Sequence, residues 1–228
     1  MRIGASIVRG MISLPEIIPK FNKQYPNVEI RYVDSLSSEL EMFVEEGNLD
    51  FAIVLSGKPN KKLIEVPLLK DFIYLCVPDS LLKEYYGDES EGLKLKSLSG
   101  ANVEDFCRLP FAMYSNRLGK SIYECFEVAG CEPKVRFTTS FSQLLLPLCV
   151  QGIAACFIAR MNLANAIDQF DGKVNIFPLF FEGKAMIQEL SLIRHKDKYL
   201  PNYAKDFLEI IYDYFVKLEQ VDLTRVCK

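Results

Sequence analysis

The sequence is poor in the residues on which most catalytic and metal sites depend. It has a single histidine, His195, which lies between two basic residues in a polar segment. It has no G-x-S-x-G motif, no phosphate loop and no His/Cys spacing of the kind that holds a metal. We therefore expect no enzyme activity, no catalytic residues, no metal and no cofactor.

Long runs of one residue type are also missing. There is no basic run and the net charge is −3, which argues against a surface that grips nucleic acid. The longest apolar run, around residues 144–150, is far too short to span a bilayer. The N-terminus carries no apolar stretch typical of a secretory signal. We expect a soluble protein without a membrane partner.

Cysteine is present in an odd number. The seven cysteines lie mostly inside apolar segments, which is typical of reduced thiols that serve as small hydrophobic side chains. Reduced thiols indicate a cytoplasmic protein. The chain has 228 residues, of which 50% are hydrophobic, so it can bury a substantial core and divide into two lobes.

Strands and helices are expected to alternate along the chain. Residues 2–5 form a short strand that turns at Ser6 into an apolar helix, and the apolar run 50–55 is typical of a strand covered on both faces. This order predicts an α/β fold with parallel strands and helices on both faces of the sheet. Further strands are expected at 28–33, 63–69, 72–78, 109–114, 135–139, 153–159, 174–178 and 189–194, and further helices at 37–46, 81–86, 103–107, 115–130, 140–152, 161–168 and 201–218.

Local signals predict how two of these helices begin. Ser37 or Ser38 is expected to cap the helix that ends near Glu46. Ser140 and Gln143 have the spacing of a capping box for the helix that follows them.

Five segments carry a family pattern in the right order and with the right spacing. They are IGAS…LPEIIPKFNKQYPNVEI, GNLDFAIV, LIEVPLLKDFIYLCVP, TTSFSQLLLPLCVQGIAACFIAR and KDKYLPNYAKDFLEII. Together they resemble the effector-binding domain of LysR-type transcriptional regulators over nearly the whole chain. The resemblance implies two Rossmann-like lobes, similar to the type II periplasmic binding proteins and joined by two crossover strands. Regulatory lobe I would comprise residues 1–75 and 193–228, and regulatory lobe II residues 76–192.

The resemblance also implies partners and a location. A small-molecule effector would bind in the cleft between the lobes, and this domain would form a homodimer, with a tetramer when the regulator is intact. The family's N-terminal winged helix-turn-helix domain is absent from this chain, so DNA would be bound only through that missing domain. We therefore interpret the chain as a truncated form or a natural fragment of a cytoplasmic bacterial regulator.

The first strand-to-helix turn supplies four candidate effector contacts, namely Ser6, Ile7, Val8 and Arg9. Family members that bind carboxylates often have a hydroxyl where Val8 stands. Arg9 could instead bind a carboxylate or phosphate through two parallel hydrogen bonds, and a helix N-terminus favours anions. The alternatives are a solvated Arg9 on the outer face of the helix and a Ser6 that only caps it.

The remaining candidates lie in the second half of the chain. Ser115 and Asn116 follow a buried strand, although both residues are also ordinary in turns. Ser140 lies at a third strand-to-helix turn, where capping alone would explain it. Cys156 and Phe157 match wall positions of the family's cleft, and core packing is the alternative for Phe157. The expected effector is a small, anionic metabolite.

Two other functions stay open at this point. A redox sensor would use cysteines, and Cys125 resembles the second cysteine of the family's peroxide-sensing branch. That branch's first cysteine would lie near Asn116, where none is present, and Cys131 could pair with Cys125 only if the Cα atoms approach within about 7 Å. A free-standing solute-binding protein shares the fold, but seven cysteines and no export signal count against it.

Overall fold

The computed structural model describes residues 1–166 and 172–227 and divides into two compact units. Unit 1 comprises Met1–Asp71 and Gln188–Val221, and unit 2 comprises Phe72–Ile187 and Asp222–Lys228. Both units are α/β, which confirms the predicted fold class. The chain passes between the units three times. The first two crossings lie inside strands, a few residues away from the expected boundaries, and the third follows Val221.

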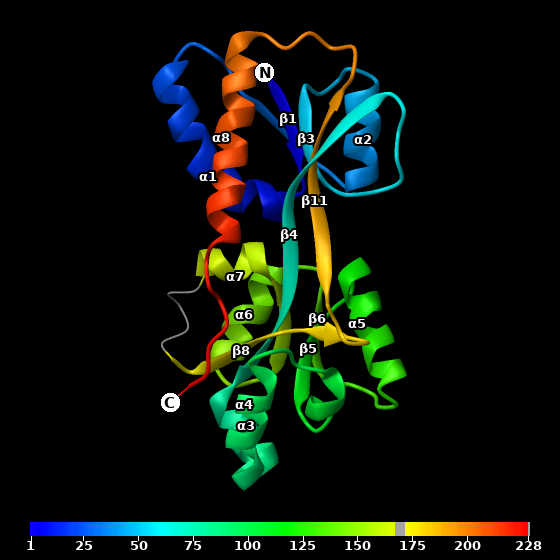
Figure 1. Ribbon diagram of the computed structural model, residues 1–228, viewed down its shortest axis with the longest axis vertical. Helices are drawn as coiled ribbons and strands as arrows, with labels where there is room; N and C mark the ends of the chain where they lie inside the picture. Colours follow the sequence, from blue (N-terminus) through cyan, green and yellow to red (C-terminus); the bar gives the residue numbers. More distant parts are fainter. Residues whose placement is uncertain (167–171, 228) are drawn as a thin grey trace. The chain divides into compact units, whose positions relative to one another are not determined.

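Unit 1 contains part of a nine-stranded sheet and has helices on both faces of it. Its strands lie in the order β2-β1-β3-β11, with β1 parallel to both β2 and β3 and with β11 antiparallel to β3. Helices α1 and α8 lie together on one face and α2 covers the other (Figure 1). The elements are β1 (Arg2–Ala5), α1 (Ile7–Gln24), β2 (Arg31–Asp34), α2 (Ser37–Glu45), β3 (Phe51–Leu55), the first half of β4 (Leu63–Pro78), β11 (Ile187–His195) and α8 (Asn202–Glu219).

Aromatic side chains join α1 and α8 to the sheet of unit 1. The ring of Phe207 on α8 meets Phe21 on α1 edge-on at 5.1 Å and stacks on Phe51 of β3 at 6.4 Å. On the other face, Leu40 and Val44 of α2 are fully buried. Burial of these apolar side chains is the main term that stabilises such a layered unit.

Unit 2 is built in the same way around the remaining strands of the nine-stranded sheet. Its strands lie in the order β6-β5-β7-β4, with β8 also paired to β4. Strand β5 is parallel to β6 and β7, whereas β4 is antiparallel to β7 and β8. Its further elements are α3 (Asp79–Tyr86), η1 (Gly87–Glu89), α4 (Ser90–Ser97), η2 (Val103–Phe106), β5 (Pro110–Tyr114), α5 (Arg117–Val128), β6 (Lys134–Thr139), α6 (Ser142–Val150), β7 (Ala155–Ala159), α7 (Arg160–Ala166), β8 (Val174–Pro178), β9 (Phe180–Phe181) and β10 (Lys184–Ala185).

The C-terminal residues complete unit 2. Arg225 and Ile176 exchange both backbone hydrogen bonds, at 2.8 and 3.1 Å, so the tail lies along β8. Leu223 is buried, and the backbone N–H of Cys227 donates to Oδ1 of the fully buried Asn175 at 2.8 Å. The sequence expectation assigned residues 193–228 to one lobe, whereas the structure places residues from Asp222 onward in unit 2, because these hydrogen bonds hold them there.

Three expected elements differ from the structure. The two strands expected at 63–69 and 72–78 are one continuous strand, because exposed Lys70 and buried Asp71 continue the alternation between them. Within 79–98 only one helix was expected, but the structure has a second, α4. Of the helix expected at 161–168, residues 167 and 168 lie outside the described residues, and α7 ends at Ala166.

Both serine capping predictions are wrong. Helix α6 begins at Ser142, so Ser140 lies too early to cap it, and the Phe141 N–H donates instead to Oγ1 of Thr139 at 3.0 Å. Ser37 is already inside α2, and its hydroxyl accepts a hydrogen bond from the backbone N–H of Leu55 at 3.0 Å. The partner of Ser37 is distant in sequence, whereas the hydrogen bond to Thr139 is a local one that the capping signal did not reveal.

Two of the cysteines form a disulfide. Cys107 and Cys131 are bonded, with their Cα atoms 6.3 Å apart. The expectation that all seven cysteines are reduced thiols is therefore wrong for this pair, and so is the suggested pairing of Cys131 with Cys125. The other five, Cys125 among them, are free and buried. In the described parts of the chain, every helix is too short or too polar to cross a membrane.

Candidate functional site

The first candidate turn, turn 1, joins β1 to α1 through Ser6–Arg9. Ser6 occupies the N-cap position of α1, as expected, but its side chain makes no capping hydrogen bond. Its hydroxyl instead accepts a hydrogen bond from Nη1 of Arg9 at 3.3 Å. The first backbone N–H groups of a helix have no partner within the helix, so those of turn 1 are available to a ligand. Ile7 is half exposed, and Val8 is partly buried.

Arg9 brings the positive charge of turn 1. Partial burial lowers the pKa of its guanidinium, while attraction to the carboxylate of Asp71 acts in the opposite direction. An arginine remains charged at neutral pH despite such a shift. Asp71 is only 4% exposed, although it is an acidic residue next to the exposed Lys70 in β4. Sequence reasoning missed Asp71, and its place at an inward position of the strand alternation, between Leu69 and Ile73, was the available signal.

Tyr32 of β2 contacts the backbone of turn 1. Its hydroxyl donates to the carbonyl oxygens of Ala5 and Ser6, at 3.2 and 3.1 Å. The ring lies against the first turn of α1 at Gly10, where a Cβ atom would come within 2.3 Å of the tyrosine hydroxyl. Glycine at this position therefore lets the tyrosine approach the helix and fix the backbone of the turn.

The second turn, turn 2, joins β5 to α5 through Ser115 and Asn116, which are both exposed. Asn116 is the N-cap of α5, and its Oδ1 accepts a hydrogen bond from the backbone N–H of Gly119 at 3.3 Å. A Cβ atom on Gly119 would lie 2.0 Å from the carbonyl oxygen of Tyr114, so the helix can start this close to the strand only with glycine there. Asn116 thus has a structural role, and Ser115 presents its hydroxyl at the surface.

The third turn, turn 3, joins β6 to α6 and contains Ser140. Strands β5 and β6 are parallel neighbours, and Tyr114 pairs with Thr139 at their carboxyl ends. The backbone N–H of Ser115 donates to the carbonyl oxygen of Thr139 at 3.0 Å. The structure therefore brings Ser115, Asn116 and Ser140 to one edge of unit 2, where parallel sheets bind ligands.

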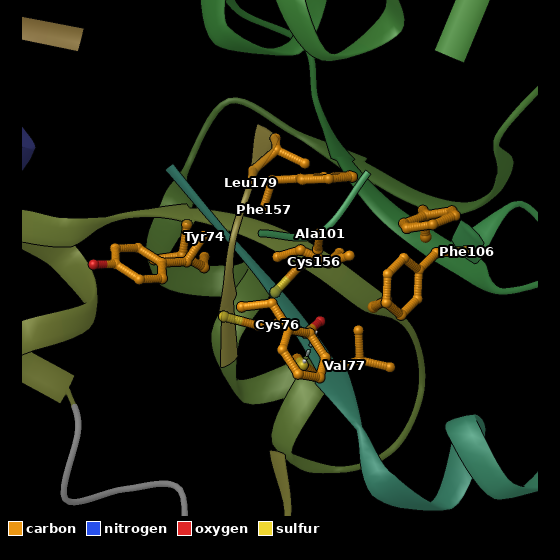
Figure 2. Packing of buried hydrophobic residues seen from close by; sticks show 14 of the residues in the cluster. Tyr74, Cys76, Val77, Ala101, Phe106, Cys156, Phe157 and Leu179 are labelled. Atoms are coloured by element: carbon orange, nitrogen blue, oxygen red, sulfur yellow. Dashed lines mark hydrogen bonds between the residues drawn. The ribbon is translucent and has the colours of Figure 1, made fainter. Parts of the chain in front are cut away.

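Cys156 and Phe157 do not lie at that edge. Both side chains are fully buried within strand β7 (Figure 2). The ring of Phe157 stacks on Phe111 at 5.5 Å and meets Phe126 edge-on at 6.1 Å. Cys156 pairs in register with Cys76 of β4, and burial raises the pKa of both thiols well above the ordinary value. Core packing, the alternative considered for Phe157, describes the position of both residues.

Two other features of the described residues are relevant to ligands. No cluster of three or more histidine, cysteine, aspartate or glutamate side chains in residues 1–166 and 172–227 has a geometry that could hold a metal. A shallow pocket in unit 1 is lined by residues that include Glu41, Lys58 and Glu65, and burial followed by repulsion from Glu65 raises the pKa of Glu41. This pocket does not include any of the predicted effector contacts.

The comparisons with known proteins identify the family. The family model described as the LysR substrate binding domain matches residues 1–215. The chain belongs to the LysR substrate binding domain family. Its relatives in that family are transcriptional regulators and not enzymes, as the sequence led us to expect.

The individual relatives are distant but similar over most of the chain. The uncharacterised HTH-type transcriptional regulator YcgK of Bacillus subtilis is 22% identical over 219 residues, covering 92% of this chain and 65% of its own length. The HTH-type transcriptional regulator CzcR of the same organism is 26% identical over 203 residues, covering 88% of this chain and 62% of its own length. The chain therefore spans less than two thirds of these relatives.

A solved LysR-family structure shows the same fold. The BenM effector binding domain with its effector benzoate matches at a TM-score of 0.68 and 16% identity, covering 97% of this chain and 94% of that domain. The predicted type II periplasmic-binding-protein-like fold is thereby confirmed. At this identity the likeness concerns the fold, so the effector contacts must be argued from this chain's own residues.

Proposed function

We propose that this chain is the effector-sensing domain of a LysR-type regulator and that its effector is a small anionic metabolite held at turns 1, 2 and 3. The observation that carries the proposal is shared by the three turns. Each lies at the carboxyl end of a parallel strand and is followed by the N-terminus of a helix, namely α1, α5 or α6. Helix N-termini attract anions because their free N–H groups and the helix dipole both favour negative charge.

The charges around the turns support an anion over a neutral ligand. Turn 1 adds the guanidinium of Arg9, which hydrogen-bonds Ser6 and so lies at the helix N-terminus. Turn 2 adds the exposed hydroxyl of Ser115 as a neutral donor. A carboxylate accepts hydrogen bonds from groups of both kinds. The BenM effector binding domain was solved with benzoate, a small carboxylate, which is in line with this chemistry.

Asp71 sets a limit on the ligand's charge. Its carboxylate lies close enough to Arg9 to act on the guanidinium electrostatically. We propose that the ligand carries a single carboxylate, because a second negative group at turn 1 would meet the charge of Asp71. The sequence analysis predicts that a single ligand contacts turns of both units, and this stays a prediction.

Binding would act on transcription through the intact regulator. We propose that DNA is bound by a winged helix-turn-helix domain outside this chain and that the regulator works in the bacterial cytoplasm. Effector binding can switch such a protein only if the ligand binds two states of it with different affinity. The match to regulator domains favours this function over a free-standing solute-binding protein.

We further propose that the domain forms a homodimer and that the intact regulator forms a tetramer. Strand β6 ends the sheet of unit 2 among the described strands, and its Val135 and Phe137 are 41% and 37% exposed. Tyr123 and Val128 on α5 are 41% and 64% exposed. Apolar side chains exposed on an edge strand and on a nearby helix are typical of a surface that another chain covers.

A thermal-shift screen tests the ligand proposal. We would compare small carboxylates, starting with benzoate, with their neutral amides, because each pair differs mainly in charge. A carboxylate at a hundred times its Kd should stabilise the protein by about 2.7 kcal/mol, and its amide should not. Arg9→Gln should weaken binding of that carboxylate at least about tenfold, whereas Lys20→Gln, at an exposed position later in the same helix, should leave it unchanged. Equal shifts with acid and amide would refute the anionic ligand.

Sedimentation equilibrium tests the dimer. Phe137→Glu places a charge in the proposed interface and should convert a dimer into a monomer. Tyr199→Glu is the matched control, because Tyr199 is 82% exposed and lies in unit 1. A monomeric parent protein, or a Phe137→Glu variant that stays dimeric, would contradict this interface.

A further inference from the structure

The disulfide encloses one complete structural unit of the fold. Cys107 directly follows η2, Cys131 directly follows α5 and its end turn, and the two are 24 residues apart in sequence. The enclosed segment therefore contains strand β5, turn 2 with Ser115 and Asn116, and the whole of helix α5. Closing the bond joins the residues just before β5 to the residues just after α5.

The other cysteines of the described chain are poorly placed to compete for an oxidant. All five are buried, whereas Cys107 and Cys131 are both partly exposed. Burial raises the pKa of Cys125, the free cysteine within α5, to about 11, so its reactive thiolate is scarce. Solvent exposure therefore makes Cys107 and Cys131 the cysteines that a dissolved oxidant or reductant can reach most easily.

We propose that Cys107 and Cys131 are a reversible thiol–disulfide pair that exchanges with small-molecule disulfides of the glutathione class and thereby fastens or releases helix α5. The pair differs from the Cys125 pairing considered from the sequence. It also acts on the fold independently of any effector. Only its consequence for ligand affinity rests on the proposed function, because turn 2 lies within the enclosed segment.

The exchange is balanced in thiols and electrons. The thiolate of one cysteine attacks a sulfur of oxidised glutathione, and the bond between the glutathione sulfurs breaks to release one glutathione thiolate. The second cysteine thiolate then attacks the mixed disulfide and releases the second glutathione. Two protein thiols are oxidised, one glutathione disulfide is reduced to two thiols, and an excess of reduced glutathione reverses both steps.

Opening the bond would act mainly on the last residues of α5 and on the turn that follows it. The N-terminus of α5 is held by the Asn116 cap in either state. Near the C-terminal end the helix is anchored by Phe126, whose ring meets Phe111 edge-on at 5.0 Å. Beyond Phe126 the helix ends within a few residues, and the backbone N–H of Cys131 donates to the carbonyl oxygen of Phe126 at 3.1 Å. Without the disulfide, the residues beyond Phe126 are held by backbone hydrogen bonds and by the packing of Ala129 and Cys131 against the core.

A redox titration tests reversibility. The protein is equilibrated in glutathione buffers from fully oxidised to strongly reducing, and accessible thiols are counted by alkylation and peptide mass analysis. The expected result is simultaneous loss of exactly these two thiols toward the oxidising end, with half conversion inside the glutathione range. A bond that persists in the most reducing buffer would make the disulfide a fixed cross-link, and two thiols that never join would exclude it. Either result overturns the proposal.

Hydrogen exchange tests the action on α5. Amides of residues 127–131, at the end of α5, should exchange on the order of a hundredfold faster in the reduced protein, because the cross-link no longer restricts local opening. Amides of α1 in unit 1 serve as the internal control and should not change. The Cys107→Ser/Cys131→Ser double variant should exchange at the reduced rate in both buffers. A redox effect of less than about threefold on α5 in the parent protein would overturn the proposal, whatever the outcome of the ligand screen.

Discussion

The two units of the molecule share one architecture but differ in how they cap the helices that follow their turns. Unit 1 leaves the start of α1 without a side-chain cap, because the Ser6 hydroxyl accepts from Arg9. Unit 2 caps α5 with Asn116, and it holds the backbone of turn 3 through Thr139. Unit 1 therefore offers free N–H groups and a positive charge, whereas unit 2 offers hydroxyls on a fixed backbone.

Unit 2 is also fastened in ways that unit 1 is not within the described residues. Its disulfide encloses β5 and α5, and its C-terminal tail pairs along β8. The ammonium of Lys94, 2% exposed, forms ion pairs of 2.6 Å with both Asp79 and Glu91. Under the proposed function, turn 1 would contribute free N–H groups and the charge of Arg9, and turns 2 and 3 would contribute hydroxyls within the more extensively fastened unit. The following predictions test this division.

The largest effect is expected for the core of unit 2. Phe157→Ala removes a fully buried ring and should reduce the free energy of unfolding by about 3 to 5 kcal/mol, as measured by urea denaturation. Phe141→Ala, at a 56% exposed position near turn 3, should cost less than about 1 kcal/mol. If Phe157→Ala left stability intact and altered only ligand binding, Phe157 would belong to the site and not to the core.

The next effect concerns the buried lysine. Lys94→Met leaves Asp79 without its buried cationic partner and should cost about 2 to 3 kcal/mol in urea denaturation. Lys96→Met is the matched control on the same helix, because Lys96 pairs with Asp105 but its side chain is 60% exposed. It should cost less than about 1 kcal/mol. Equal losses in the two variants would mean that burial of Lys94 adds nothing to its ion pairs.

The same ion pairs predict a pH dependence. Burial acts to raise the pKa of Asp79, but hydrogen bonds from Lys83, Lys94 and Asn175 outweigh it, so the pKa lies below the ordinary value. Its contribution to stability is therefore complete above about pH 5 and is lost as the pH falls through the lowered pKa. The difference in unfolding free energy between the parent and Lys94→Met should accordingly shrink below about pH 4. A gap that is constant from pH 7 to pH 3 would contradict this assignment.

A pair of glycine substitutions compares the two helix starts directly. Gly119→Ala forces a Cβ atom against the backbone carbonyl of Tyr114 and should cost about 1 to 3 kcal/mol, despite alanine's better helix propensity. Gly10→Ala meets the side chain of Tyr32, which is 39% exposed and can move, and should cost no more than about 1 kcal/mol. Thermal unfolding of both variants gives the comparison, and the reverse order would mean that turn 1 is the more rigid one.

The smallest effect compares the caps. Asn116→Ala removes a capping hydrogen bond and should lower the free energy of unfolding by about 1 kcal/mol. Ser6→Ala removes no capping hydrogen bond and should lower it by only a few tenths of a kcal/mol. Both values come from the same urea denaturation curves. A Ser6→Ala loss as large as that of Asn116→Ala would show that Ser6 caps α1 in solution and that the free N–H groups of turn 1 are fewer than proposed.

Sequence reasoning performed well wherever the signal was a repeated apolar pattern. Strand β3 and helix α8 were predicted to within two residues at each end, because burial imposes a regular spacing on the apolar residues of a strand or helix. Sequence reasoning failed to predict helix caps, because a polar side chain can hydrogen-bond either the start of its own helix or another group. Ser140 and Ser37 match local capping signals, yet neither caps its helix. The Ser37 hydroxyl accepts from the backbone N–H of Leu55, and the Phe141 N–H donates to Thr139.

The candidate site also has features that the sequence predicted and features that it did not. The sequence located all three turns, because each lies between a predicted strand and a predicted helix. It did not reveal Asp71 beside Arg9, nor that Cys156 and Phe157 face the core, because those facts depend on segments distant in sequence.

The sequence by itself determined the family, the α/β class and the positions of the turns, since these depend on local apolar periodicity and on ordered motifs. Only the tertiary structure decided which cysteines meet, which lysine is buried and where the C-terminal tail is held. Cys107 and Cys131, Lys94 and Asp79, and Arg225 and Ile176 are each brought together from separate parts of the chain. No local pattern encodes such meetings, because they are selected by the packing of the whole unit.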